Sequence, residues 1–240
     1  MQMDVYYFQA KVLPERALIS FEFSTVFSHY ISGERAKAKV SAVLNHVAIW
    51  VEAENEWNIF DLRNCVAYIL NMHFAARSFV TGCAYDFEIT RVINREREID
   101  CVFGINVVAV PNSVEDSDIE ASIRKLLQKA VGAEGLFLNR CLADFLSALK
   151  DVNDAAFYCY RAIESLRHHC AALNGLSNES KSKQWEKFRE SAQCEESVLL
   201  SLKDAADPIR HGAVPGLKSQ DQQHLLALTW KIIDTYTRNL

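Results

Sequence analysis

The segment from Lys203 to Gly212, KDAADPIRHG, carries the residues of this chain with the clearest chemical potential. Arg210 and His211 are adjacent there. A histidine with an unperturbed pKa near 6.5 can accept or donate a proton at cellular pH, and an arginine guanidinium can bind a phosphate group. The pair is therefore typical of a site that handles a phosphodiester, and Lys203 can add positive charge to it.

Two neighbouring residues predict how this pair is held. Pro208 disfavours helical geometry at Asp207, so the preceding helix is predicted to end there. Gly212 can take left-handed backbone angles and turn the chain toward the next helix. Arg210 and His211 are then expected at a sharp corner between a helix and a loop, rather than along an extended surface.

A purely structural role for the same residues stays open. Arg210 can form an ion pair with Asp204 or Asp207. His211 can cap the end of the helix, where positive charge is favoured by the helix dipole. Spacing alone does not decide between the structural and the chemical role.

No other motif in the sequence predicts a cofactor or a metal. There is no glycine-rich phosphate loop, no G-x-S-x-G elbow and no H-E-x-x-H pair. His168, His169 and Cys170 are adjacent, but neighbouring residues of a helix point about 100° apart, so the three cannot face one ion. His73 and Arg77 share a helix face at i and i+4, a spacing typical of solvated surface.

The first half of the sequence alternates between apolar and polar residues with a period of two. Strands of this kind have one dry and one wet face and belong to antiparallel sheets. A helix over residues 59–82 interrupts them, and Gly82 is a natural stop. Turns are predicted at Asn45-His46 and at residues 95–98. The predicted strands lie within residues 19–27, 38–53, 85–89 and 99–107.

From Pro111 onward the apolar residues recur with the period of a helix. Serine and aspartate residues between 111 and 118 can cap a helix start. The predicted organisation is α+β: an antiparallel sheet of five or six strands with one covering helix in residues 1–112, then a bundle of about five helices in residues 113–240. The predicted helices lie within residues 138–149, 159–173, 181–193, 198–206 and 225–236.

Residues from about 136 to 238 resemble a HEPN domain (higher eukaryotes and prokaryotes nucleotide-binding). The resemblance is carried by residues 155–166, AAFYCYRAIESL, by the variable helix at 181–193, and by the corner at 207–212, DPIRHG. Many HEPN domains are ribonucleases that need no metal and act as dimers. Their motif is an arginine followed, after four to six residues, by a histidine that takes part in RNA cleavage.

The corner departs from that motif. His211 stands where the histidine of the family would stand, before a glycine. Positions 204–206, where the arginine is expected, hold Asp-Ala-Ala instead. Lys203 is one residue too early, and Arg210 is directly adjacent to the histidine. The catalytic motif is therefore incomplete.

Two functions follow from this resemblance and stay open. One is a ribonuclease of a prokaryotic defence or toxin system that needs no metal, in which His211 is the general acid or base, Arg210 stabilises the charge of the phosphorane and Lys203 assists. The other is a non-catalytic module in which the sheet recognises an unknown ligand or protein. In both, the resemblance implies a homodimer formed through the helical bundle, with RNA as a candidate partner.

Composition limits these alternatives. The chain has 240 residues, half of them hydrophobic, and a net charge of −5. Acidic residues outnumber basic ones in both halves, so no domain has the strongly basic field that is typical of nucleic-acid binding. The seven cysteines are scattered, without a Cys-x-x-Cys pair, and no apolar run is long enough to span a membrane. A reduced, cytoplasmic protein without a membrane partner is predicted.

Overall fold

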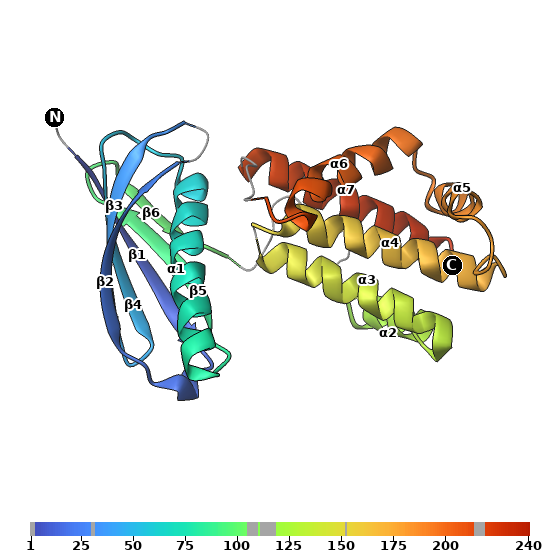
Figure 1. Ribbon diagram of the computed structural model, residues 1–240, viewed down its shortest axis with the longest axis horizontal. Helices are drawn as coiled ribbons and strands as arrows, with labels where there is room; N and C mark the ends of the chain where they lie inside the picture. Colours follow the sequence, from blue (N-terminus) through green and yellow to red (C-terminus); the bar gives the residue numbers. More distant parts are fainter. Residues whose placement is uncertain (1–2, 30–31, 105–109, 111–118, 152, 214–218) are drawn as a thin grey trace. The chain divides into compact units, whose positions relative to one another are not determined.

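The computed structural model describes residues 3–29, 32–104, 110, 119–151, 153–213 and 219–240 (Figure 1). The chain divides into two compact units, Met1–Ile105 and Asn106–Leu240, and each is described here by itself. The predicted boundary at residue 112 and the predicted helix caps at 111–118 lie outside the described residues. The first unit is built on an antiparallel sheet and the second is helical, which confirms the predicted α+β class.

The first unit contains a sheet of six strands in the order β2-β3-β4-β1-β5-β6, with every neighbouring pair antiparallel. A short 3-10 helix at Glu15–Ala17 follows the first strand. The strands are β1 (Asp4–Leu13), β2 (Phe21–Ser28), β3 (Arg35–Val43), β4 (His46–Ala53), β5 (Asp86–Asn94) and β6 (Ile99–Val102).

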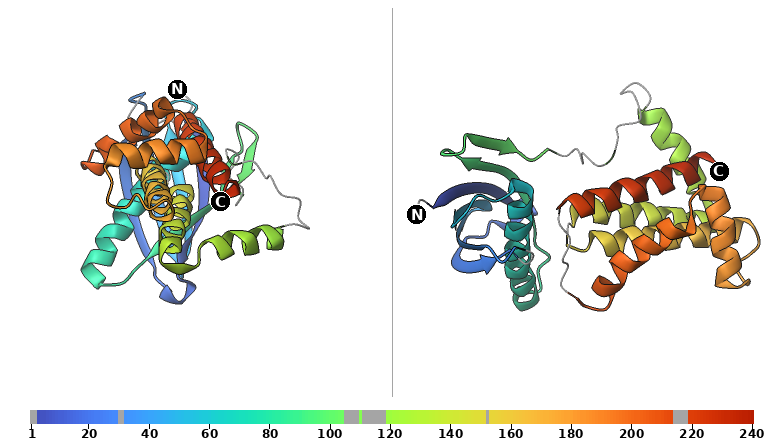
Figure 2. Two further views of the ribbon diagram at one scale, coloured as in Figure 1. Left: turned by 90° about the vertical axis from the view of Figure 1, so that its right-hand side faces the viewer. Right: turned by 90° about the horizontal axis from the view of Figure 1, so that it is seen from above.

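Helix α1 (Ile59–Thr81) lies along one face of this sheet, as Figures 1 and 2 show. The Asn58 side chain caps its first turn by accepting hydrogen bonds from the N–H groups of Phe60 and Asp61. Gly82 ends it with a φ of +68°, as the sequence predicts. Alternate residues of the strands form one apolar face of the sheet. This face packs against α1, and together they make the core of the unit.

The sequence does not predict β1, which is the strand that joins the two halves of the sheet by pairing with both β4 and β5. Its outward residues include Val5 and Tyr7, so apolar side chains stand on both faces and the alternation is blurred. Strand β6 ends at Val102, whereas a strand to residue 107 is predicted; residues 105–109 lie outside the described residues.

The β3–β4 hairpin turns at Leu44 and Asn45, one residue before the predicted turn. Both residues have positive φ, 46° and 71°, as a two-residue type I′ turn requires. The buried Asn45 side chain does more than turn the chain. Its Nδ2 donates to the Glu15 carbonyl at 2.6 Å and its Oδ1 accepts from the Ile19 N–H at 2.9 Å. The hairpin is thereby tied to the segment that joins β1 to β2.

The second unit consists of helices in its described part, and α4 is central to it. Figures 1 and 2 show α4 beside α3, α6 and α7, and it also packs against α5. Five helices are predicted and confirmed. Helix α2 is not predicted, and it has no buried residue of its own. The helices are α2 (Ile119–Lys129), α3 (Gly132–Lys150), α4 (Ala155–Leu173), α5 (Lys181–Ala192), α6 (Glu196–Arg210) and α7 (Ser219–Arg238).

A buried carboxylate joins α3 to α4. Asp144 is 2% exposed, and Arg161 of α4 donates to its Oδ1. Arg140, one turn earlier on α3, donates to Oδ2 at 3.2 Å. Both oxygens of the carboxylate are therefore paired, the condition under which a buried charge is tolerated.

We expect Asn45→Ala to lower the free energy of unfolding by about 2–4 kcal/mol, because one buried and one part-buried backbone group lose their partners and alanine is strained at positive φ. Asn45→Gly loses the same hydrogen bonds without the strain, so its loss should be smaller. Urea unfolding followed by circular dichroism measures both. Equal losses would show that the backbone conformation contributes nothing.

Candidate functional site

The C-terminal end of α6 has a defined cap geometry. His211 is the C-cap residue, and Gly212 has a φ of +85°. The Gly212 N–H donates to the Ile209 carbonyl at 3.0 Å, and the Ala213 N–H donates to the Pro208 carbonyl at 2.9 Å. These two bonds form a Schellman motif, which satisfies the last carbonyls of a helix. The predicted turning role of Gly212 is confirmed.

The prediction that Pro208 ends the helix is wrong. Helix α6 continues through Pro208 to Arg210. A proline lacks its own N–H and so removes one helical hydrogen bond, but the following residues still find acceptors. The His211 N–H donates to the Asp207 carbonyl at 3.1 Å. The helix therefore ends at Arg210 rather than at Asp207, and the chain turns at Gly212 as predicted.

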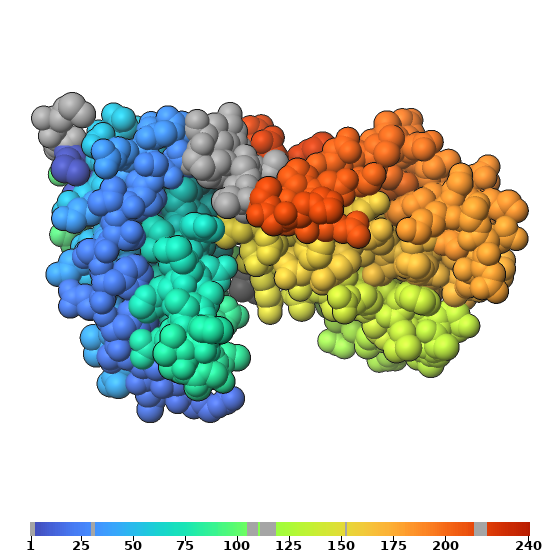
Figure 3. Space-filling model, in the orientation of Figure 1, coloured from blue at the N-terminus to red at the C-terminus, as the bar shows by residue number. Residues whose placement is uncertain are grey.

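The three predicted site residues are all exposed, and Figure 3 shows the end of α6 at the surface of the helical unit. Lys203, Asp207 and Arg210 are spaced i, i+4 and i+7 and so share one side of the helix. Lys203 Nζ lies 3.9 Å from Asp207 Oδ2. Within the described residues, no carboxylate is at ion-pair distance from Arg210. The Arg210 guanidinium and the His211 imidazole are therefore both exposed to solvent, at consecutive positions of the chain.

Tyr160 of α4 belongs to the same neighbourhood and is not predicted as a site residue. Burial raises its pKa, and the charges of Glu164 and Asp207 raise it further while Arg210 acts in the opposite direction. The phenol therefore keeps its proton at neutral pH and can donate a hydrogen bond. Its ring stacks on Trp185 of α5, with centroids 6.4 Å apart. Only the packing of α4 against α6 brings it near the corner, so spacing in the sequence could not have found it.

The structure also shows what occupies the positions of the expected motif arginine. Asp204 is exposed, Ala205 is half-buried and Ala206 lies in the core, 1% exposed. A long cationic side chain has no room at position 206. Within residues 203–213, the part of this corner that the structure describes, the lysine and arginine side chains are Lys203 and Arg210.

The adjacent residues His168, His169 and Cys170 point to different neighbours, as the helical spacing predicts. The His168 ring stacks on Phe137 with centroids 5.5 Å apart, and buried His169 pairs its Nδ1 with the Tyr236 hydroxyl at 2.8 Å. Cys170 is in the core of the bundle. Within the described ranges, no group of three histidine, cysteine, aspartate or glutamate side chains could hold a metal ion.

The interpretation of His73 and Arg77 as solvated surface is wrong. The His73 ring lies against Phe21 and Phe23, with both centroid distances 4.5 Å. Arg77 lies over the rings of Phe21 and Tyr85 at 5.7 and 5.9 Å. Burial lowers the pKa of His73, and the charge of Arg77 lowers it further. The edge strand β2 places aromatic rings over this side of α1, which the sequence spacing on the helix does not reveal.

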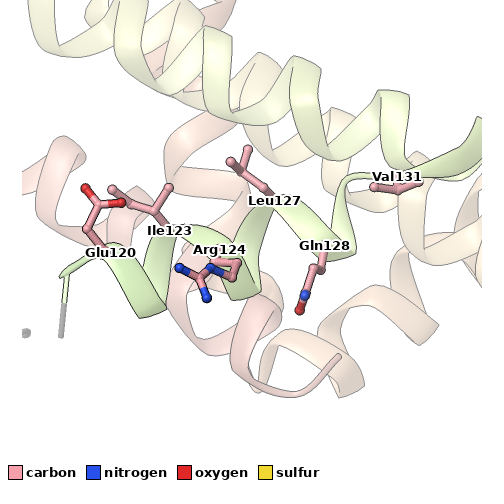
Figure 4. Close-up of a pocket in the computed structure, with 6 residues that line it drawn as sticks. All are labelled: Glu120, Ile123, Arg124, Leu127, Gln128 and Val131. Atoms are coloured by element: carbon pink, nitrogen blue, oxygen red, sulfur yellow. The ribbon is translucent and has the colours of Figure 1, made fainter.

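A shallow hollow lies along α2, shown in Figure 4. Its lining residues are all exposed and come from α2 and from Val131, the residue directly before α3, so no second element forms an opposite wall. They are Glu120, Ile123, Arg124, Leu127, Gln128 and Val131. The hollow therefore offers apolar contact but no arrangement of acid, base or nucleophile.

Two family models match this chain. The model described as Domain of unknown function (DUF8168) N-terminal domain matches residues 6–103, and the DUF8168 C-terminal domain matches residues 123–240. The chain belongs to the DUF8168 family. The DUF8168 N-terminal domain corresponds to the sheet with α1, and the C-terminal domain holds the α6 corner. No curated protein and no solved structure matches the chain. Among the described helices, none is long and apolar enough to cross a membrane.

Gly212→Ala should destabilise the helical unit by about 1–2 kcal/mol, because alanine is strained in left-handed geometry. Thermal unfolding of this variant beside Ala213→Ser, which changes a residue outside the positive-φ position, measures the effect. An unchanged midpoint for Gly212→Ala would contradict the role of the Schellman motif in holding the corner.

The buried His169 should make stability fall in mild acid. Burial lowers its pKa, so the unfolded state binds more protons than the folded state below the unfolded value near 6.5. Stability should therefore be lost as pH falls through and below that value. Urea midpoints between pH 7.5 and 5 measure this loss, and His169→Gln should flatten the dependence. An equally steep dependence in that variant would assign the effect to other groups.

Proposed function

We propose that the DUF8168 C-terminal domain acts on RNA at the end of α6, as an endoribonuclease that needs no metal. The observation that carries this proposal is the exposed Arg210–His211 pair on a helix end fixed by a Schellman motif. The resemblance of residues 136–238 to a HEPN domain supports RNA as the substrate. The cytoplasm is the proposed compartment, and a prokaryotic defence or toxin system is the proposed context.

The chemistry assigned to the pair is an attack within the RNA strand. His211 takes the proton of a ribose 2′-hydroxyl while the 2′-oxygen bonds to the adjacent phosphorus. The bond between this phosphorus and the 5′-oxygen of the next nucleotide breaks. The products are a 2′,3′-cyclic phosphate and a 5′-hydroxyl, whose oxygen receives a proton. Arg210 stabilises the extra negative charge of the pentacoordinate phosphorane, and Lys203 adds to the field.

This reaction needs one group to accept a proton and another to donate one. Each chain supplies one histidine at the corner, so two corners complete the pair. That requirement agrees with the homodimer through the helical bundle that the HEPN resemblance implies. The proton of Tyr160 is retained at neutral pH, which makes its hydroxyl a further donor for a phosphate oxygen.

A second candidate is a non-catalytic interaction module, and one observation favours it. The expected arginine position nearest to His211 is filled by Ala206, which is buried in the core. In that case the bundle serves dimerisation and the sheet recognises a ligand or a protein partner. The two candidates differ in whether His211 does chemistry, so one substitution separates them.

The test is to incubate the full chain with tRNA and mRNA in EDTA, beside His211→Ala and Arg210→Ala. We expect the wild type to cleave and His211→Ala to lose at least about 100-fold in rate, the effect of removing a general acid or base. His224→Ala, on α7, is the matched control and should cleave normally. No cleavage by the wild type, or equal cleavage by His211→Ala, would contradict the ribonuclease and favour the interaction module.

A further inference from the structure

The sheet of the N-terminal domain has one face that α1 does not cover. Helix α1 is the only α-helix in the described part of this unit, and it lies against the face that carries Tyr6 and Phe8 (Figure 1). Successive side chains of a strand point to opposite faces, so the intervening residues of β1, β3 and β4 stand on the other side. Most of those residues are exposed or half-buried, and we call this side the open face.

Two aromatic rings meet at the centre of the open face. Tyr7 of β1 and Trp50 of β4 are direct partners in the strand register. Their ring centroids are 5.4 Å apart and the rings are tilted by 51°. Trp50 is 41% exposed and contributes little to the core. Tyr7 is half-buried. Large aromatic residues are usually buried, so an exposed tryptophan packed against a half-buried tyrosine of a central strand marks a contact surface.

Three basic residues stand beside this pair on the same face. Arg35, Lys37 and Lys39 occupy alternate positions of β3, and all three are exposed. Lys39 is the register partner of Trp50. It lies 3.1 Å from Glu22, but both side chains are more than half exposed, and such a pair is weak. In the part of the chain that the structure describes, Arg35 and Lys37 have no carboxylate at ion-pair distance.

These features fit a single strand of RNA better than a protein partner. Every base has a π face, so an exposed aromatic ring binds bases without regard to sequence, and neighbouring lysines and arginines bind the phosphates. Two acidic residues stand on the same face: Glu52, opposite Lys37 in the register, and Glu22 of β2, beside Lys39. On β2, β3 and β4 together, the three basic residues of β3 outnumber these two carboxylates.

We propose that the open face of the N-terminal domain binds single-stranded RNA. Trp50 and Tyr7 stack on bases, and Arg35, Lys37 and Lys39 contact the phosphates. The choice of RNA rests on the proposed function of the α6 corner. The open face would bind the RNA on which that corner acts. Unpaired bases are required, because the bases of a duplex are already stacked on one another.

The test uses the full chain and a short, fluorescein-labelled 2′-O-methyl oligouridylate, which lacks the free 2′-hydroxyl needed for cleavage. We expect Trp50→Ala to raise the Kd about 5- to 150-fold, the range for losing one base–aromatic stack. Phe79→Ala is the matched control, since Phe79 is 90% exposed but lies on α1, and it should bind as the wild type does. Equal binding by Trp50→Ala and wild type overturns the proposal.

Salt dependence tests the phosphate contacts separately. Replacing Lys37 and Lys39 together by alanine should reduce the slope of log Kd against log salt by about 1.4, since each phosphate contact to a single strand contributes about 0.7. An unchanged slope overturns the assignment of these lysines. Equal competition by duplex RNA of the same length overturns the requirement for unpaired bases, and with it the stacking on Trp50 and Tyr7.

The outcomes of this test are separate from those of the cleavage assay. Because the probe cannot be cut, binding that depends on Trp50 supports the open face even if His211 proves inactive. Cleavage that depends on His211, with binding unaffected by Trp50→Ala, overturns the open face alone. A second copy of the chain is the other occupant to be tested, by sedimentation of the wild type and of Trp50→Ala without RNA. If the wild type is a dimer that Trp50→Ala dissociates, this face is an interface between copies and the proposal is overturned.

Discussion

A sheet covered by a single helix has only one face shielded from water, and the structure of the N-terminal domain depends on this constraint. Alternate residues of β1, β3 and β4 are buried under α1, from Tyr6 to Ala53, and form one core. Since the side-chain period of a strand is two, the same register that buries these residues puts their neighbours on the open face. The exposure of Trp50 and of the basic residues of β3 is therefore a consequence of how the core is made.

The helical domain follows a comparable rule around α4. That helix is surrounded by α3, α5, α6 and α7, and the ion pairs of Asp144 join it to α3 where a free charge would be costly. Leu199 and Leu202 of α6 belong to the core, and Ala206 is buried as well, which leaves no space for a cationic side chain five residues before His211. The chemistry available at the corner is thus limited by the core beneath it, and Arg210 is the remaining guanidinium.

Periodicity predicted most of the elements, and its failures have identifiable causes. The helix at 59–81 and the five main helices of the second unit were accessible because each buries one apolar stripe. Strand β1 was missed because Tyr7 and Val5 make its outer face apolar as well. Helix α2 was missed although Ile119, Ile123 and Leu126 recur at helical spacing; none of its residues is fully buried, and Leu126 packs against the core. The prediction that Pro208 ends the helix failed because a proline in the last turn removes only one hydrogen bond. The N–H groups of residues 211–213 still bond to carbonyls of this turn.

The sequence by itself determined the α+β class, the antiparallel sheet, the helical second half, and the adjacency of Arg210 and His211 before a turning glycine. These are local properties, set by side-chain alternation, helical periodicity and backbone preference. Only the tertiary structure decided that the charge of Arg210 acts on Tyr160, that His73 stacks on aromatic rings of β2, and that Tyr7 and Trp50 meet on an uncovered face. Each of these depends on segments far apart in the chain, whose pairing is chosen by the packing of whole elements rather than by any local pattern.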